Sequence, residues 1–181
     1  IDASSSSMME RLLWAMDDLE IELPSWGFVN TGTRFRVWQQ AGVPRSVDEK
    51  IDDAGTVRRY TGIAKSVALH IPWDKVADYG DLARHAADLG VALGTINSNT
   101  FQDDDYMLGS VCHPDAPVRR KALDHLLECV EIMDATGSRD LKLWFADGTN
   151  YPGQDDIRAR QDRLAESLAV VYARLGDRQR M

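Results

Sequence analysis

The chain has 181 residues, 44% of them hydrophobic and 28% charged, which is the composition of a globular protein with a sizeable core rather than of a disordered chain. Its formal net charge of -8 leaves no basic surface of the kind that nucleic acids or anionic membranes need. The sequence also has no apolar run of membrane-spanning length, no signal peptide at its start and only two cysteines, Cys112 and Cys129, so it predicts a cytoplasmic protein without a disulfide.

The first 24 residues predict a serine-rich tail followed by an amphipathic helix that Pro24 ends. The apolar residues of this helix recur at helical spacing and are Met9, Leu12, Leu13, Met16 and Leu19. A continuous apolar face of this kind predicts that the helix packs on something larger.

Residues 25–66 predict a glycine-bearing arm and a second helix. The arm runs to Pro44 without a hydrophobic period, which is far longer than an ordinary connection, so we expect it to be functional or interfacial. It has too few apolar residues for a packed strand, and we expect Phe35 to project away from its own core. The helix is predicted over residues 47–60, because Ser46 and Glu49 have the spacing of a capping box.

Residues 67–181 alternate between short apolar runs, typical of buried strands, and amphipathic helices. The strands are predicted at 67–72, 91–97 and 141–145, and the helices at 81–89, from about Pro114 to Gly137, and at 157–175. Strands that alternate with helices imply right-handed crossovers and a parallel sheet, so the predicted fold class is α/β.

An open doubly wound sheet and a closed barrel both fit this order. The open sheet normally has a glycine-rich turn after its first strand, whereas the first of these strands ends in His70-Ile71-Pro72-Trp73-Asp74. The barrel is therefore favoured. Because an eight-stranded barrel takes roughly 250 residues, we expect a partial (β/α)8 TIM barrel. It would comprise the first three β/α units plus an N-terminal helical extension, with further strands beyond Met181 or on another chain.

The carboxyl ends of the predicted strands carry aromatic and polar residues, and in β/α barrels these ends hold the reacting groups. The residues are His70, Trp73 and Asp74 after the first predicted strand, Asn97, Asn99 and Phe101 after the second, and Trp144, Phe145 and Asp147 after the third. Aromatic faces beside a few hydroxyl-binding groups are typical of a sugar pocket. We therefore expect His70, Trp73, Phe101 and Trp144 to cluster on one rim of the sheet.

Other interpretations of these positions remain open. His70 is either a catalytic residue or a partly buried histidine with its hydrogen bonds satisfied. Asp74 either orients the His70 imidazole or caps the following turn, and Trp144 lies either in the pocket or in the core.

Two further clusters contain metal-binding residue types without the spacing of a metal site. The run Asp103-Asp104-Asp105 lacks the pattern of a calcium loop and is interpreted as a solvated loop. Zinc is disfavoured because Cys112-His113, followed by His125 and Cys129, lacks the usual paired knuckle. Helix arginines such as Arg119 and Arg163 are interpreted as solvated faces.

Five stretches of the sequence resemble the broad-specificity bacterial L-rhamnose isomerases, a family related to the D-xylose isomerases. They are P-S-W-G-F at 24–28, N-T-G-T-R-F at 30–35, A-L-H-I-P-W-D at 68–74, N-S-N-T-F at 97–101 and K-L-W-F-A-D-G at 142–148. These motifs are long and composite, and the resemblance extends over nearly the whole chain from Pro24.

The resemblance implies a metal-dependent aldose–ketose isomerase on a β/α barrel. Such an enzyme is a homotetramer with two divalent ions, commonly manganese, that polarise the sugar oxygens at C1 and C2. The resemblance implies that His70 helps to bind and open the sugar, and that Phe35 enters the active site of a neighbouring subunit. It also implies that Trp73, Phe101 and Trp144 form the apolar side of the pocket.

The family's metal ligands are Glu, Asp and His residues at the ends of the fourth and later strands, so no residue of this chain is assigned as a ligand. The leading hypothesis is the N-terminal half of an isomerase that acts on L-rhamnose and related sugars and is inactive as an isolated fragment. The alternatives are a sugar or sugar-phosphate epimerase on the same barrel, and a non-catalytic sugar-binding or assembly module.

Overall fold

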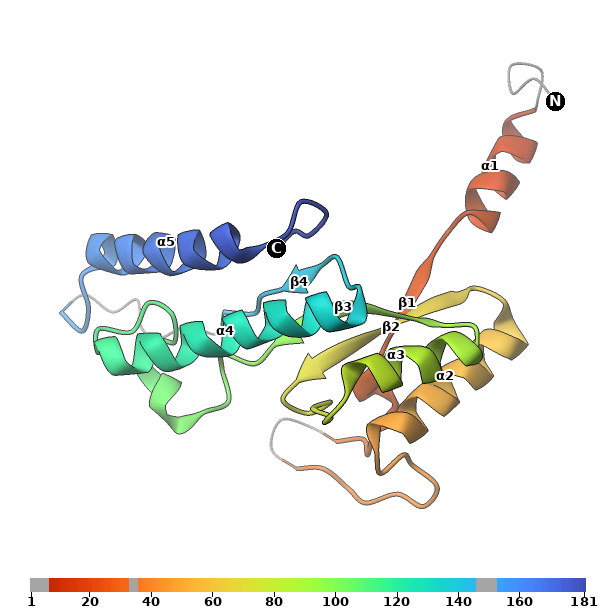
Figure 1. Cartoon of the computed structure of the whole chain (residues 1–181), viewed down its shortest axis with the longest axis horizontal. Helices are drawn as coiled ribbons and strands as arrows, with labels where there is room; N and C mark the ends of the chain where they lie inside the picture. Colours follow the sequence, from red (N-terminus) through yellow and green to blue (C-terminus); the bar gives the residue numbers. More distant parts are fainter. Residues whose placement is uncertain (1–6, 33–35, 146–152) are drawn as a thin grey trace.

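A four-stranded parallel sheet forms the centre of the computed structural model, which describes residues 7–32, 36–145 and 153–181 (Figure 1). The strands are β1 (Ile21–Pro24), β2 (Ala64–Ile71), β3 (Ala92–Ser98) and β4 (Leu141–Lys142), and they lie side by side in that order. Each neighbouring pair is parallel, as the alternation of strands and helices predicted.

One helix precedes the first strand, and the other helices connect the strands or follow the last one. They are α1 (Met8–Asp17), α2 (Val47–Thr61), α3 (Tyr79–Asp88), α4 (Ala116–Thr136) and α5 (Ile157–Arg174), with two short 3₁₀ helices, η2 (Ser25–Phe28) and η3 (Asp104–Leu108). The helices α2, α3 and α4 lie along one face of the sheet, and α5 packs against α4 (Figure 1). A parallel sheet with crossover helices on one face is the arrangement of a partial (β/α)8 barrel, so the predicted fold class is confirmed.

The predicted number of three β/α units is wrong, because the described chain contains four. The missed strand is β1, which pairs with β2 through the register Leu23 to Val67 and Pro24 to Ala68. It has four residues and ends in a proline, which the sequence analysis interpreted only as the end of a helix. Proline is tolerated there because β1 is an edge strand of the described sheet. The last strand is shorter than predicted and contains only Leu141 and Lys142.

Capping residues end the helices close to the positions that the sequence predicted. Ser46 accepts a hydrogen bond from the Glu49 backbone N–H at 3.2 Å and so caps α2. The Glu49 side chain binds the backbone N–H of Arg45 rather than that of Ser46. Gly137 ends α4 with φ of 73°, a left-handed conformation that glycine adopts without steric cost.

The hydrophobic core lies between the sheet and the helices α2, α3 and α4. Val67, Leu69 and Ile71 of β2 point to this side and are fully buried. The helices contribute their own buried side chains to the same cluster, among them Ile51, Leu82, Leu126, Val130 and Met133. Replacing one of these large side chains by alanine typically lowers the free energy of unfolding by about 2–5 kcal/mol. The core therefore holds the strands, and with them the strand ends, in fixed positions.

The opposite face of the sheet is polar near β1. The Glu22 carboxylate accepts hydrogen bonds from the Thr95 backbone N–H at 2.8 Å and from the Ser66 hydroxyl at 3.2 Å. A side chain on Gly94 would meet this carboxylate, since a Cβ there would lie 1.6 Å from Glu22 Oε1. The two faces of the sheet therefore differ in chemistry, with apolar residues toward the helices and polar groups on the other side.

The helix α1 stands away from the rest of the chain (Figure 1). Its apolar side chains are exposed, with 55% of Leu12 and 46% of Trp14 open to solvent, so the predicted packing on a larger body is wrong for the part of the chain that the structure describes. The amphipathic pattern was detected correctly, but a pattern specifies a face and not its partner. No described helix is both long and apolar enough to cross a membrane.

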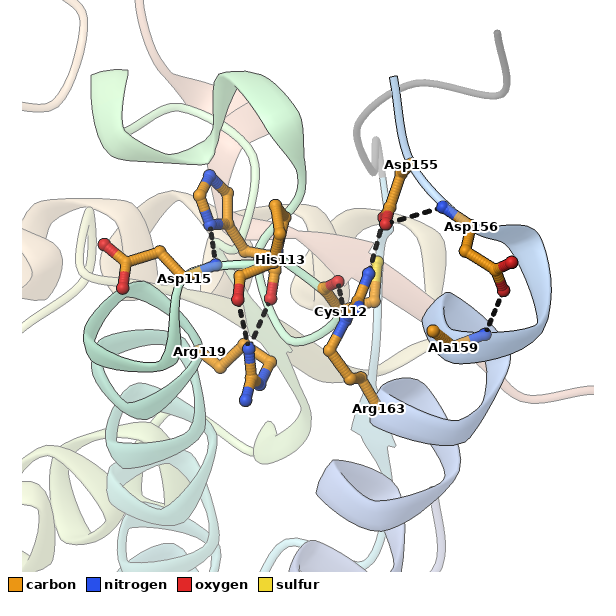
Figure 2. A network of polar contacts seen from close by, with 9 residues as sticks. Cys112, His113, Asp115, Arg119, Asp155, Asp156, Ala159 and Arg163 are labelled. Carbon is orange, nitrogen blue, oxygen red and sulfur yellow. Dashed lines mark hydrogen bonds and ion pairs between the residues drawn. The ribbon is translucent and has the colours of Figure 1, made fainter. Parts of the chain in front are cut away.

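The helix α5 is tied to the loop between β3 and α4 by Arg163 (Figure 2). The guanidinium donates to the Cys112 carbonyl at 2.8 Å and to the Asp155 carboxylate at 2.5 Å. Arg119 donates to the carbonyls of His113 and Pro114 (Figure 2). The interpretation of these two arginines as solvated faces is therefore wrong, because sequence spacing does not show which carbonyls a long side chain reaches.

After α5 the chain returns to the free side of β4. Arg180 forms a parallel bridge with Asp140, its N–H donates to the Arg139 carbonyl, and its carbonyl accepts from the Leu141 N–H, both at 2.8 Å. Residue 180 thus occupies the position of a fifth parallel strand next to β4, which is the order that a β/α barrel requires.

Candidate functional site

A pocket of about 210 Å³ lies at the carboxyl ends of the four strands. It is lined by Trp26, His70, Trp73, Asn97, Ser98, Phe101, Lys142 and Trp144. Trp26 follows β1 on η2, Trp73 follows β2, Phe101 follows β3 and Trp144 follows β4, so every described strand contributes an aromatic ring. The predicted clustering of His70, Trp73, Phe101 and Trp144 at one rim is what the structure shows.

The His70 imidazole lies at the centre of the aromatic rings and is only 7% exposed. The Trp73 indole stacks on it with ring centroids 3.8 Å apart and an interplanar angle of 14°. Trp26 and Phe101 approach the imidazole edge-on, with centroids at 5.5 and 6.1 Å. Three aromatic rings thus fix the plane of the imidazole without using its nitrogen atoms.

One nitrogen of His70 lacks a hydrogen-bond partner. Nδ1 is buried and has no partner within the described residues, although buried polar atoms are normally paired. Burial lowers the pKa of His70 from 6.5 to about 4, and the nearby Asp74 carboxylate opposes this shift only in part. The imidazole is therefore neutral at physiological pH and can exchange a hydrogen bond with a hydroxyl or ring oxygen without bringing a charge into the pocket.

Asp74 holds the backbone around His70 rather than its ring. The carboxylate is completely buried and accepts the His70 backbone N–H at 2.7 Å. It also binds the Lys50 ammonium at 2.5 Å and the Ser25 hydroxyl. Of the two roles left open for Asp74, orientation of the imidazole is therefore wrong, and the carboxylate stabilises the turn that follows β2. Because Ser25 precedes Trp26, the same buried charge links two walls of the pocket.

Trp26, Ser98 and Lys142 also line the pocket, although the sequence pattern alone did not indicate them. Trp26 was missed because the strand before it was missed, whereas Lys142 pairs in register with Asn97 and so points to the same side of the sheet. The alternation of side chains between the two faces of a strand could therefore have indicated from the sequence that Lys142 lies on the same face as Trp144. Asn97 donates from its amide to the Leu69 carbonyl at 3.1 Å, which fixes its side chain at the floor of the pocket.

Trp144 lies in the pocket and not in the core. Its ring is 66% exposed and lies 6.0 Å from Phe101 between centroids. Phe35 and Asp147, which the sequence analysis placed at the site, lie outside the described residues. The predicted projection of Phe35 therefore stays a prediction.

The described ranges contain no group of three His, Cys, Asp or Glu side chains that could hold a metal ion. His113 accepts the Asp115 backbone N–H through Nδ1 at 2.9 Å (Figure 2). His125 accepts the Asn99 backbone N–H through Nε2 at 3.0 Å, while Cys112 and Cys129 are buried and form no disulfide. Asp103 and Asp105 both pair with Lys121, which accounts for two of the three consecutive acids.

Comparison with known proteins finds sugar isomerases among the relatives of this chain. It is 41% identical over 162 residues to a probable sugar isomerase of Rhizobium meliloti strain 1021, and 39% identical over 165 residues to one of Mesorhizobium japonicum. These matches cover 87% and 88% of this chain, and the chain spans 38% of the length of each relative. No protein-family model matches the sequence.

Solved structures with the same fold include ketose epimerases. The chain superposes on an L-ribulose 3-epimerase with a TM-score of 0.58 at 18% identity, over 86% of this chain and 46% of the other. The D-psicose 3-epimerase of Clostridium cellulolyticum gives 0.59 at 11%, over 86% and 48%. A candidate xylose isomerase of Rhodospirillum rubrum gives 0.57 at 13%, over 86% and 50%. At these identities the likeness shows a shared fold and nothing more.

Proposed function

We propose that this chain is the N-terminal part of an aldose–ketose isomerase that acts on L-rhamnose and related sugars. The observation that carries the proposal is the pocket at the strand ends, in which a neutral, buried His70 is surrounded by Trp26, Trp73 and Phe101. The similarity to two probable sugar isomerases supports this reaction class.

The residues of the pocket suit a neutral polyhydroxylated ligand. Aromatic faces pack against the C–H surface of a sugar, and the neutral imidazole of His70, which lines the pocket, can exchange a hydrogen bond with one of its oxygens. Isomerisation moves one hydrogen from C2 to C1 and one proton from the C2 oxygen to the C1 oxygen. In this proposal His70 binds the sugar and assists its opening, while Trp73, Phe101 and Trp144 exclude water from the far end of the sugar.

The proposed enzyme uses two divalent ions, manganese being the first choice. The described residues of this chain do not form a set of ligands for such ions, and we assign none of them to a metal. The ligands would belong to the part of the barrel that lies outside the described residues.

The proposal includes a cytoplasmic homotetramer. Phe35 would reach the active site of a neighbouring subunit from the arm between η2 and α2. Within that arm, the described residues on either side of Phe35 are joined by an antiparallel bridge between Gly32 and Val37 and by a hydrogen bond from the Trp38 N–H to the Thr31 carbonyl.

A ketose 3-epimerase is the second candidate. The fold neighbours favour it, because an L-ribulose 3-epimerase and a D-psicose 3-epimerase superpose on the chain about as well as the candidate xylose isomerase does. The aromatic pocket itself fits an aldose or a ketose, so the two activities are distinguished by product analysis.

The test uses the whole protein to which this chain belongs, incubated with L-rhamnose and manganese and analysed for ketose. In a parallel reaction D-psicose and L-ribulose are analysed for 3-epimers. We expect ketose from L-rhamnose, and a loss of roughly 100- to 10,000-fold in kcat/KM when His70→Gln is introduced. Epimer formation without ketose formation would establish the second candidate. A whole protein that converts none of these sugars would contradict both.

A further inference from the structure

We propose that Gln102 and His125 are positioning residues for this pocket, acting on Trp73 through the loop that follows β3. The effect on sugar binding rests on the proposed function, whereas the effect on Trp73 itself does not. Neither residue lines the pocket that contains His70.

Gln102 fixes the orientation of the Trp73 indole. Its side-chain oxygen accepts the indole Nε1–H at 3.0 Å and also the amide of Asn99 at 2.6 Å. An indole has a single hydrogen-bond donor, so this one contact determines how the ring is turned. The Trp73 ring is 45% exposed, and packing against its neighbours therefore leaves nearly half of its surface unconstrained.

The orientation of Trp73 determines what His70 presents to a ligand. The indole covers one face of the imidazole in a nearly parallel stack at 3.8 Å. If the indole turned away, that face of His70 would be open to water and the pocket would lose one of its walls. Gln102 thus acts on the site through Trp73, without contacting a ligand.

His125 holds the start of the loop that carries Gln102. It lies on α4, its side chain is 15% exposed, and its Nε2 accepts the Asn99 backbone N–H at 3.0 Å. This contact requires the proton on Nδ1, which lies 3.7 Å from the Glu128 carboxylate. The side chain of Asn99 in turn accepts the Gln102 backbone N–H at 3.2 Å.

Hydrogen bonds therefore form a continuous path from His125 on α4 through Asn99 and Gln102 to Trp73, and the ring stack of Trp73 on His70 extends this path into the pocket. The path crosses from β3 to β2 and joins two loops that are about thirty residues apart in sequence. Each of the three hydrogen bonds is worth roughly 1 kcal/mol, which is enough to set a ring orientation but not to hold the fold together.

The first experiment reads the position of Trp73 directly, in the whole protein labelled with 5-fluorotryptophan. The ¹⁹F resonance of Trp73 is assigned by its absence in the Trp73→Phe variant. We expect Gln102→Leu and His125→Leu to shift or broaden this resonance and to leave that of Trp14 unchanged. Gln161→Leu, the same substitution at an exposed glutamine on α5, is the matched control and should leave the Trp73 resonance in place. A Trp73 resonance unchanged by Gln102→Leu overturns the proposal.

The second experiment uses kinetics on the sugar substrate. Losing one hydrogen bond that positions a pocket wall should raise KM by roughly 3- to 10-fold and leave kcat within about twofold, because in the proposed function Trp73 packs against the far end of the sugar and not against the reacting carbons. In a Trp73→Phe background the indole donor is absent, so Gln102→Leu should have no further effect on KM. Fully additive changes in KM overturn the proposal.

His125→Gln provides a rescue test, because an amide oxygen can replace Nε2 as the acceptor for the Asn99 N–H. We expect it to restore the ¹⁹F position that His125→Leu shifts. A whole protein without activity on sugars would contradict the proposed function, and the ¹⁹F measurements would still decide the positioning role of Gln102 and His125.

Discussion

The His70 imidazole and the Trp73 indole lie face to face, with centroids 3.8 Å apart and planes 14° from parallel, and His70 lies near the end of β2 while Trp73 lies in the turn that follows it. This stack removes one face of the imidazole from water and contributes to the burial that lowers the pKa of His70 to about 4. The residues around this stack therefore determine the titration, the stability and the ligand binding that we expect of the site.

The titration of His70 is the first prediction. Its resonance in ¹³C-histidine NMR of the whole protein, assigned with His70→Gln, should keep its neutral position down to about pH 5, because burial disfavours the imidazolium. The unfolded chain binds this proton near pH 6.5, so the free energy of unfolding should fall as the pH decreases from about 6.5 to about 4. A midpoint near 6.5 in the folded protein would show that the pocket does not bury the ring as described.

The buried ion pair between Lys50 and Asp74 should matter more for stability than any exposed pair. Lys50→Met leaves the fully buried Asp74 carboxylate without its cation, and we expect a loss of about 3–5 kcal/mol in urea unfolding of the whole protein. The control is Lys65→Met, which breaks the exposed pair with Glu20 and should cost no more than about 1 kcal/mol. Equal effects of the two substitutions would contradict this assignment.

A double variant distinguishes the loss of charge pairing in Lys50→Met from the loss of side-chain packing. Adding Asp74→Asn removes the unpaired charge and keeps an oxygen for the His70 backbone N–H, so the double variant should recover part of the lost stability. If the double variant is instead less stable by the full sum of the two single effects, the carboxylate and the ammonium are not coupled.

Trp144 should contribute to ligand binding and little to stability. Its ring lines the pocket and is 66% exposed, so Trp144→Ala should raise KM for the sugar by roughly 5- to 30-fold and change the free energy of unfolding by less than about 0.5 kcal/mol. Tyr172→Ala, at a 69% exposed aromatic residue on α5, is the control for surface truncation and should change neither quantity. A large loss of stability with unchanged KM would place Trp144 in a packing role.

The two cysteines should be inert in the folded protein. Burial raises the pKa of Cys129 to about 12, which leaves almost no thiolate at neutral pH, and Cys112 is only 2% exposed. Iodoacetamide followed by peptide mass spectrometry should find both residues unmodified in buffer and alkylated in 6 M urea. Rapid alkylation of Cys129 in buffer would mean that α4 opens away from the sheet.

Residues 1–181 expressed alone should neither form ketose from L-rhamnose nor bind manganese specifically. Their described part offers no converging set of oxygen ligands for a hard divalent ion, and the free edge of β1 favours self-association. Ketose formation by this fragment with added manganese, measured beside the whole protein, would refute the assignment of the metal ligands to the rest of the barrel.

The sequence alone was sufficient for the fold class and for the aromatic residues of the pocket. Apolar runs of strand length alternate with helices that have one apolar face, and this local order permits few topologies. His70, Trp73, Phe101 and Trp144 could be placed because parallel strands bring their carboxyl ends to one rim. The four-residue strand β1 gave no such signal, and Trp26 was not assigned to the site for the same reason.

Only the tertiary structure decided which partner each polar group takes. Asp74 binds Lys50 from α2, 24 positions away in sequence, and Gln102 accepts from Trp73, 29 positions away. Hydrogen bonds depend on distances and angles of a fraction of an ångström and a few tens of degrees, which residue spacing does not specify across separate elements. The pattern of the sequence therefore determined which residues gather at the rim, and the packing of α2 and α4 against the sheet determined how His70 and Trp73 are held there.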